Sequence, residues 1–593
     1  MPKPEKISRR PPRGTVALIL FCFLYLTFTW TNFWNTNEYS RIFLTRALIE
    51  HQTFSIDKII IHHDTQDKSF FRKNFYSNKA PISSFLAAPV YLAARMTQIY
   101  TGLRLSEPML LYLITSLCLS IPSALFLLLL FKFWSLITLR YPLRRALLIA
   151  YALGTITWPY STMYYGHQLA GMSLFIAFLI TFSARELNLD SKTLFKSGFF
   201  CGLAFSIEYP TALISFCIFI YAATVGKKLR AALYLILAAF LIGTLWSQLD
   251  LIQSVIGPHI QSLINPRKAI LIMAVVITAS LGLPAISRAP KLLLFFLGCA
   301  IPVGVTFYYH WKCFGGPLQF PYYHETYRLF TIAHQRGIAG VSFPGSLHEL
   351  GGQLSALFQL LISPYRGLFF YSPFLLLGLF GIVKMIRHPG WKQEGWLFLS
   401  ITAVYFVFLS AFSDWEGGWS MGPRHLVPLL PFLVTAVIFQ IGKSVGKIRR
   451  ILAWILAPTA LIAIAFVFIG TVVFPYFPKE FKNPLYDLSW LFLIQGKFAP
   501  TIGEICGLKG FARLIPLIVL TGVLMAILLL DLSREAYRRI KGRTIFCLFS
   551  VAIAAGFLFL AVLGSQWRTE KLSRYERVLQ ENQAKRVEAF MKR

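Results

Sequence analysis

Long apolar runs recur along this chain from residue 14 to residue 565, and they limit its fold more than any other feature. A helix needs about 20 predominantly apolar residues to cross a bilayer, so runs spaced this closely leave no room for a large soluble domain. Only 14% of the residues are charged and 56% are hydrophobic, whereas a soluble domain has about 25% charged residues. The sequence therefore predicts an all-α polytopic membrane protein, with residues 1–593 as a single transmembrane domain.

Several runs are close to the minimum length for a span, and we therefore expect about 13 to 15 transmembrane helices. We interpret the first run as a membrane helix and not as a signal peptide, because no small-residue cleavage site follows it. The runs that can span are 14–31, 108–131, 144–160, 167–183, 195–208, 210–224, 230–247, 269–286, 291–308, 367–383, 396–412, 425–442, 451–473, 512–530 and 544–564.

The charges between the runs predict how the chain crosses the membrane. Alternate connections are short and basic, so the positive-inside rule places them and the N-terminus in the cytoplasm. The formal charge of +33 arises from these short clusters, which favours membrane lipid and argues against nucleic acid as a partner. The other connections hold most of the acids, aromatics and glycines outside the spans, and we expect them on the outer side: 32–107, 161–166, 309–366, 413–424 and 474–511.

Two further helices are expected beside the spans. Residues 82–103 are apolar, but a span here would place the basic connection 132–145 outside, so we interpret them as an interfacial helix that closes the first outer loop. An ordinary span that violates the charge rule is the alternative. The tail 566–593 has a thin apolar stripe and charge pairs at helical spacing, which predict an amphipathic helix lying on lipid or on a loop.

The first outer loop, 32–107, carries the strongest candidates for chemistry. Glu38 lies shortly after the first run, near the membrane interface, where partial burial can raise the pKa of a carboxylate enough for it to act as a general base. The alternative is an ion pair with Arg41 or Arg46 at helical spacing. The loop also contains Asp64 and Asp67, which are candidates for acceptor contacts or for a divalent cation.

The end of this loop reads NFYSNKAP and contains Tyr76 and Lys79. Because proline disfavours helix in the residue before it, we expect Lys79 at a turn, where its ammonium can bind a lipid phosphate. A lysine that snorkels to the interface is the alternative. The run His62-His63-Asp64 has the residue types of a metal site, but adjacent residues of an extended segment point in opposite directions, so a metal here stays open and is not the favoured interpretation.

Three later segments add candidate ligand-binding residues. Residues 309–328 are rich in aromatics and include Tyr323 and His324, which suits a platform for a sugar or a lipid headgroup. Arg366 and Arg424 precede apolar runs in outer segments, and arginine binds phosphate with two parallel hydrogen bonds. Anchoring at the interface is the alternative.

Polar residues inside or beside the apolar runs are expected to be functional or paired. Glu208 lies where two runs meet, and His167 opens another run from the outer side. Together with Arg41, Tyr76, Tyr323, His324 and His425, they are candidates for substrate binding.

Four stretches carry a resemblance to a known family: NEYSR at 37–41, YSNKAP at 76–81, RGLFFYSP at 366–373 and GGWSMGPRHLVPLLPFL at 417–433. They resemble membrane-embedded glycosyltransferases of the C-type (GT-C) fold, especially bacterial relatives of the protein O-mannosyltransferases and lipid A aminoarabinose transferases (glycosyltransferase family 39-like). The resemblance covers most of the chain loosely and the first outer loop most specifically. It implies a bacterial inner-membrane enzyme whose active site faces the periplasm.

The resemblance implies a sugar donor on a polyprenyl phosphate and an acidic residue after the first span as catalytic base. Glu38 is the counterpart of that acid, although Asn37-Glu38 replaces the family's Asp-Glu, and Asp64 or Asp67 can take part of the role. Lys79 is similar to the family's phosphate-binding lysine, with Ala80-Pro81 in place of Pro-Pro, and Arg424 is a further phosphate ligand. The acceptor, whether lipid, glycan or protein, stays open, as does a divalent cation.

The main rival from another class is a transporter or flippase for a lipid-linked glycan. Transporters tend to have two matching halves with broken helices and a site near the membrane midplane. Here the polar residues are concentrated in one outer loop near the N-terminus, and the two halves show no similarity. A non-catalytic scaffold of the cell envelope also stays open.

Overall fold

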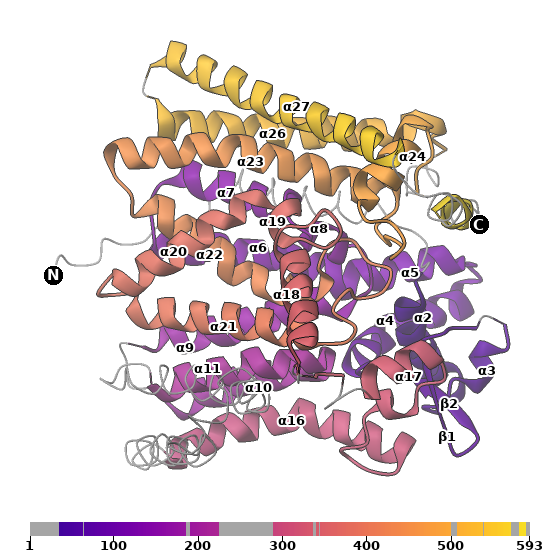
Figure 1. The fold of residues 1–593 in the computed structure, drawn as a ribbon. Helices are drawn as coiled ribbons and strands as arrows, with labels where there is room; N and C mark the ends of the chain where they lie inside the picture. The colour runs from indigo at the N-terminus through magenta and orange to yellow at the C-terminus, as the bar shows by residue number, and fades with distance from the viewer. Residues whose placement is uncertain are drawn as a thin grey trace, which may run out of the picture.

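The computed structural model describes residues 35–62, 64–185, 190–224, 289–335, 340–342, 344, 346–499, 507–537, 539–570 and 580–588. The helices of this part of the chain are accompanied by one antiparallel ribbon, which pairs β1 (Lys68–Phe71) with β2 (Asn74–Ser77). The all-α prediction is confirmed. In Figure 1 the long helices lie side by side, and the ribbon and several short helices gather at one end of the bundle.

The helices in the first part of the chain are α2 (Thr36–His51), α3 (Asp57–Ile60), α4 (Ile82–Thr101), α5 (Glu107–Thr115), η1 (Ser116–Ser120), α6 (Ile121–Phe133), η2 (Trp134–Leu136), α7 (Tyr141–Leu153), α8 (Thr157–Tyr160), α9 (Gly166–Ser183), α10 (Ser191–Ile207), η3 (Tyr209–Thr211) and α11 (Ala212–Thr224). The later helices are α16 (Ala289–Phe314), η5 (Pro321–His324), α17 (Arg328–Gln335), α18 (Leu347–Leu361), α19 (Leu368–Tyr371), η6 (Pro373–Leu375), α20 (Leu376–Arg387), α21 (Lys392–Ala411), η7 (Arg424–Leu429), α22 (Leu430–Gly442), α23 (Gly446–Val473), η8 (Leu485–Trp490), α24 (Leu491–Ile494), η9 (Gly510–Leu514), α26 (Ile515–Ala536) and α27 (Ile540–Glu570).

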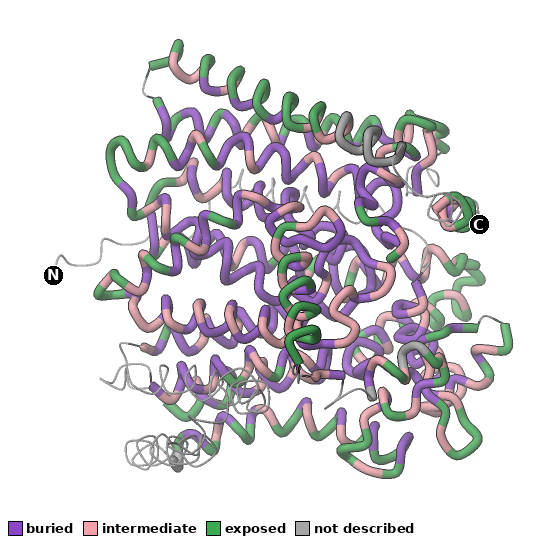
Figure 2. Tube along the Cα trace, in the orientation of Figure 1, coloured by how far each residue is buried: buried purple, intermediate pink, exposed green. Residues whose placement is uncertain are grey.

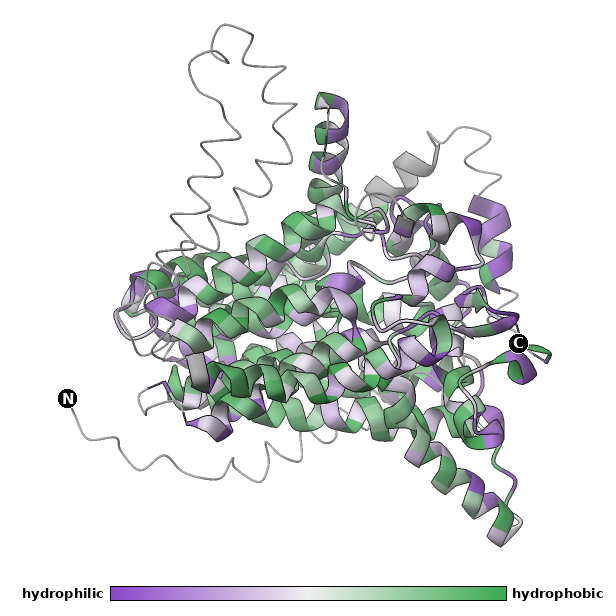
Figure 3. Cartoon of the chain, turned by 90° about the horizontal axis from the view of Figure 1, so that it is seen from below, coloured by the Kyte–Doolittle hydropathy of each residue, from purple (hydrophilic) through white to green (hydrophobic). Residues whose placement is uncertain are grey.

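Eight helices among the described residues are long and apolar enough to cross a membrane, which makes this a polytopic membrane protein. Three predicted runs, 14–31, 230–247 and 269–286, lie outside the described residues, and several others form helices shorter than a full span. The expected total of about 13 to 15 spans therefore stays a prediction. Figure 3 shows long helices that are mainly hydrophobic, with hydrophilic residues gathered toward their ends.

The centre of the bundle is α22, in which every residue from Leu430 to Phe439 is buried. The outermost helix is α27, which exposes large apolar side chains such as Phe559 and Leu560. This gradient is visible in Figure 2 as buried segments in the middle and exposed ones at the edge. Apolar exposure along a spanning helix is expected where lipid, and not protein, surrounds it.

Small residues allow two helices to approach closely where α10 crosses α16. A Cβ atom added at Gly198 would lie 1.9 Å from the carbonyl oxygen of Phe295, and one at Gly202 would lie 2.5 Å from that of Cys299. The two glycines are four residues apart and so lie on the same face of α10. This is the small-residue spacing that membrane helices use for close packing.

Ion pairs join helices on the side of the bundle predicted to be cytoplasmic. Asp531 of α26 is fully buried and binds Arg145 of α7 through two hydrogen bonds of 2.6 and 2.8 Å. Glu535 contacts Arg140 and Arg449 at 3.4 Å each, which adds α23 to the same network. Of these acids Asp531 is fully buried, and removing the partner of a buried charge costs about 3–5 kcal/mol.

The two helices expected beside the spans, at 82–103 and in the tail, lie at the end of the bundle away from these ion pairs (Figure 1). The segment 82–103 contains α4, which packs on α2 and is not among the candidate spans; its place at the interface stays a prediction. In the tail, residues 580–588 are helical and lie on the 474–511 connection, because Glu588 binds Lys497 at 3.0 Å and Gln583 donates to Glu480 at 3.3 Å. The tail lies on a loop, one of its two predicted placements.

Candidate functional site

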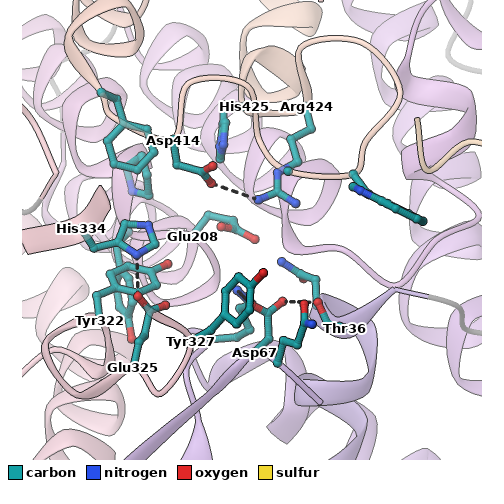
Figure 4. Close-up of a pocket in the computed structure, with 18 of the residues that line it drawn as sticks. Thr36, Asp67, Glu208, Tyr322, Glu325, Tyr327, His334, Asp414, Arg424 and His425 are labelled. Atoms are coloured by element: carbon teal, nitrogen blue, oxygen red, sulfur yellow. Dashed lines mark hydrogen bonds and ion pairs between the residues drawn. The ribbon is translucent and has the colours of Figure 1, made fainter. Parts of the chain in front are cut away.

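A cavity of about 600 Å³ lies at the end of the bundle that holds the β-ribbon. Its walls come from the start of α2, the residues around the ribbon, the α10–η3 junction, the segment from η5 to α17, the 413–424 loop and the tail. Cavities of this size hold small organic ligands. Figure 4 shows acidic, basic and aromatic side chains pointing into it from several of these elements.

The β-ribbon brings Asp67 and Lys79 together. Its register pairs Lys68 with Ser77, so the residues just outside the two strands emerge side by side. The two-residue turn between the strands has positive φ at Arg72 (45°) and at Lys73 (72°), as the tight hairpin turn with matching twist requires. Lys79 Nζ then lies 3.1 Å from Asp67 Oδ1.

The Asp67 carboxylate is nearly enclosed and well supplied with donors. It is 4% exposed, Thr36 Oγ1 donates to Oδ2 at 3.0 Å, and Asn78 Nδ2 lies 3.4 Å from Oδ1. Burial alone would raise the pKa of this carboxyl, but the Lys79 ammonium, Arg424 and the Thr36 hydrogen bond together outweigh burial and hold the pKa below its usual value. Asp67 is therefore an ionised carboxylate held in a cavity by a lysine.

Arg424 enters the cavity from the 413–424 loop and η7. Its Nη2 lies 3.9 Å from Asp414 Oδ2, and its guanidinium lies 5.5 Å from the centre of the Tyr165 ring. The loop passes so close that a Cβ atom at Gly417 would lie 2.8 Å from Arg424 Nε, and the backbone there has φ +73°. Arg424 Nε is buried and has no hydrogen-bond partner within the described residues, so it has a donor to offer a ligand.

Glu208 lines the cavity between these groups and is held from behind. Its Oε1 accepts a hydrogen bond of 2.6 Å from Arg41 Nη2, and its Oε2 lies 3.8 Å from His167 Nδ1. His167 and His425 also line the cavity, with their rings edge to face at 5.2 Å. Their Nε2 atoms are buried without a hydrogen-bond partner in the described part of the chain. Buried polar atoms of this kind are expected to bind a ligand or water.

The structure brings seven of the predicted site residues to this cavity. They are Asp67, Lys79, His167, Glu208, Tyr323, Arg424 and His425. Arg41 contacts it indirectly through Glu208. The predicted residues that do not line it are Glu38, Asp64, Tyr76, His324 and Arg366.

Glu38 is enclosed in protein beside the cavity. It is 1% exposed, and its two oxygens accept hydrogen bonds from Tyr164 N at 2.7 Å and from Tyr476 Oη at 2.5 Å. Burial raises its pKa to about 8 against the opposing effect of the Tyr476 and Tyr164 hydrogen bonds. The raised pKa was predicted, but the carboxyl does not face the cavity; its role as base stays a prediction.

Arg366 supports the loop that carries Arg424. It is fully buried, and its guanidinium donates to the carbonyl oxygens of Tyr365, Glu416, Gly418 and Phe477 at 2.9 to 3.2 Å. The guanidinium N–H groups in these contacts are thus hydrogen-bonded to backbone carbonyl oxygens. Phosphate binding by Arg366 stays a prediction, while its observed contacts hold the loop.

The other three predicted residues lie on the surface or in a packed aromatic cluster. Asp64 is exposed and forms an ion pair with Lys68. Tyr76 packs edge-on against Phe314 at 5.5 Å, and His324 stacks on the same ring at 5.2 Å. None of the three lines the cavity.

Several lining residues were not predicted. Glu325 and His334 form a buried pair with 2.6 Å between Oε2 and Nδ1, and Asp414, Tyr322 and Lys479 also line the cavity. Glu325 was recognisable as the one acid within the aromatic segment 309–328. Among the described residues there is no group of three His, Cys, Asp or Glu placed to hold a metal ion.

Comparisons with protein-family models, with curated proteins and with solved structures find no match to this chain.

Proposed function

We propose that this protein is an integral-membrane glycosyltransferase that moves a sugar from a polyprenyl-phosphate donor to an acceptor at the outer face of the membrane. The observation that carries this proposal is the buried Asp67–Lys79 pair, with the two groups 3.1 Å apart in a cavity that Arg424 enters. Such an arrangement combines a carboxylate that can take a proton with two cations that can bind a phosphate.

The donor phosphate is assigned to Lys79 and Arg424. Lysine binds phosphate as a point charge, and arginine adds directed hydrogen bonds. The apolar lining residues Phe408 and Phe412 belong to α21 and its C-terminal cap, and α21 is a candidate span. A phosphate in the cavity can therefore carry an isoprenoid chain that leads toward the bilayer.

Asp67 is assigned as the general base in preference to Glu38 and Asp64, because it alone of the three lines the cavity. In the free protein the Lys79 ammonium keeps its pKa low. When the donor phosphate shares that ammonium, the buried carboxylate loses part of its stabilisation and its proton affinity rises. Donor binding thus prepares the base.

The transfer is a single displacement. The acceptor oxygen or nitrogen attacks the anomeric carbon, its proton passes to the Asp67 carboxylate, and the bond from the anomeric carbon to the phosphate oxygen breaks. The electron pair of that bond leaves on the lipid phosphate, whose charge Lys79 and Arg424 stabilise. The anomeric configuration is inverted.

The test is transfer or hydrolysis of a radiolabelled polyprenyl-phosphate sugar by the full-length protein in nanodiscs. Loss of a general base costs about 10²- to 10⁴-fold in rate, so Asp67→Asn should lose at least about 100-fold. Asp64→Asn is the matched control, because Asp64 belongs to the same loop but is exposed. Full turnover by Asp67→Asn, or loss of turnover in Glu38→Gln with Asp67→Asn active, would refute the assignment.

A further inference from the structure

The segment from η5 to α17 forms a wall of the cavity with a different chemistry from the rest. Its lining residues are Phe320, Tyr322, Tyr323, Glu325, Tyr327 and His334. None of these is Lys or Arg, whereas Lys79, Arg424, Lys479 and Arg586 line the cavity from other parts of the described chain. In Figure 4, Tyr322, Glu325 and His334 lie together on one side, Arg424 lies on the other, and Glu208 lies between them.

Hydrogen bonds hold this wall in one conformation. His334 Nδ1 and Glu325 Oε2 are 2.6 Å apart, and Asn78 Nδ2 donates to Glu325 Oε1 at 2.8 Å. The same amide nitrogen lies 3.4 Å from Asp67 Oδ1. Asn78 therefore links the wall to the carboxylate assigned as base.

The backbone also fixes the wall to the β-ribbon. Ser69 pairs with Glu325 in an isolated bridge, Ser69 Oγ donates to the carbonyl oxygen of Pro321 at 2.7 Å, and the Thr326 amide donates to that of Lys68 at 3.2 Å. Because this surface is already ordered, binding a ligand costs little conformational entropy of the protein.

The wall presents a cluster of aromatic side chains beside the buried carboxylate of Glu325. The Tyr322 and His334 rings stack with their centres 4.6 Å apart and an interplanar angle of 24°. Aromatic faces are electronegative and attract the slightly positive C–H face of a saturated ring. A carboxylate accepts hydrogen bonds from neighbouring groups. The combination fits a sugar ring, and the lining residues of this wall include no lysine or arginine to bind an anion.

We propose that the wall of Tyr322, Glu325 and His334 is the acceptor subsite, and that the acceptor is a sugar residue of a glycan. This inference rests on the proposed function. It places the acceptor hydroxyl near Asp67, which Asn78 joins to Glu325, and across the cavity from Arg424 (Figure 4). Tyr322 and His334 contact the ring, and Glu325 is a positioning residue that orients His334.

The test measures sugar contact and phosphate binding separately, with the full-length protein in nanodiscs free of glycoside detergent. Saturation-transfer NMR with methyl β-D-glucopyranoside reports contact of the sugar ring with the protein. We expect a signal in the wild type that falls about 2- to 10-fold in Tyr322→Ala and in His334→Ala, as loss of an aromatic contact predicts. Tyr322→Phe keeps the stacking surface and should retain the signal.

Two controls make the outcome specific. Tyr100→Ala removes an aromatic ring that is 83% exposed and outside the cavity, and it should leave the sugar signal unchanged. Binding of a fluorescent polyprenyl phosphate should be lost in Lys79→Ala and retained in Tyr322→Ala.

No sugar signal in the wild type, or a signal that Tyr322→Ala and His334→Ala leave unchanged, overturns the subsite. If the wild type fails to bind polyprenyl phosphate, the proposed function fails. The sugar signal then still shows whether the wall of Tyr322, Glu325 and His334 binds a sugar. A variant that no longer melts cooperatively is replaced by His334→Gln, for which the same loss of signal is expected.

Discussion

Two buried carboxyl groups of the first outer loop, Glu38 and Asp67, differ in the groups that surround them. Asp67 has a lysine beside it and is held ionised, while Glu38 has hydrogen-bond donors and forms no ion pair with the described residues, and burial raises its pKa to about 8. Their exposure is similarly low. The difference that matters for function is therefore the cavity: of the two carboxyl groups, only Asp67 lines it and can contact a ligand.

The raised pKa of Glu38 predicts a pH-dependent loss of stability. The folded protein holds this proton up to about pH 8, whereas the unfolded chain releases it near pH 4.3. The stabilisation from Glu38 is thus complete below the unfolded pKa and is lost as the pH rises through about 8. Thermal melting of the wild type between pH 5 and pH 9 should show this decline.

Glu38→Gln is the matched variant, because it keeps the shape and a hydrogen-bonding amide but cannot ionise. Relative to the wild type, its melting temperature should rise between pH 5 and about pH 8 and then stay constant up to pH 9. A constant difference between the two proteins across this range would show that Glu38 does not carry the shifted proton.

Arg366 is expected to stabilise the folded protein through its contacts with backbone carbonyl oxygens. Lysine in its place cannot reach the four carbonyl oxygens that the guanidinium binds, and each buried carbonyl left without a donor costs about 1–3 kcal/mol. Arg366→Lys should therefore lower the melting temperature, whereas Arg95→Lys, on exposed α4, should not. An unchanged melting temperature together with weaker polyprenyl-phosphate binding would instead make Arg366 a phosphate ligand.

At the scale of elements, the residues of the hairpin that matter were predictable from the sequence, but their contact was not. Lys79 was expected at a turn and Asp67 was among the candidate acids, and both line the cavity. Their contact was not predictable, because it depends on the strand register, and a shift of one residue would turn the side chains to the other face. The Arg72-Lys73 turn carries no glycine to mark it.

The crossing of α10 and α16 is a second element whose energetics can be measured. Gly198→Ala places a Cβ atom 1.9 Å from a backbone oxygen, and overpacking of this kind costs about 1–3 kcal/mol. The melting temperature of Gly198→Ala should therefore be lower than that of the wild type. Gly304→Ala on α16 has nothing within 4 Å of the added Cβ and should be neutral or slightly stabilising. Equal melting temperatures would mean that the helices can move apart freely.

For the molecule as a whole, the helices were predictable because length and hydropathy determine them locally. The cavity was not, since Thr36, Asp67, Glu208, Glu325 and Arg424 meet only after the helices have packed. The pair formed by Glu325 and His334 was missed for the same reason.

The position of the cavity also bears on the rival function. A transporter for a lipid-linked glycan is expected to hold its substrate near the midplane between two matching halves. This cavity lies at the end of the bundle that holds the ribbon, and loops and short helices form much of its wall. That position favours a substrate that approaches from the membrane surface.

The most direct test of the central claim is a cryo-electron microscopy map of the protein in nanodiscs with a bound polyprenyl phosphate. The phosphate should lie between Lys79 and Arg424, and Lys79 Nζ should turn from Asp67 toward it. Density for the phosphate beside Arg366, or between the spanning helices near the membrane midplane, would contradict the account.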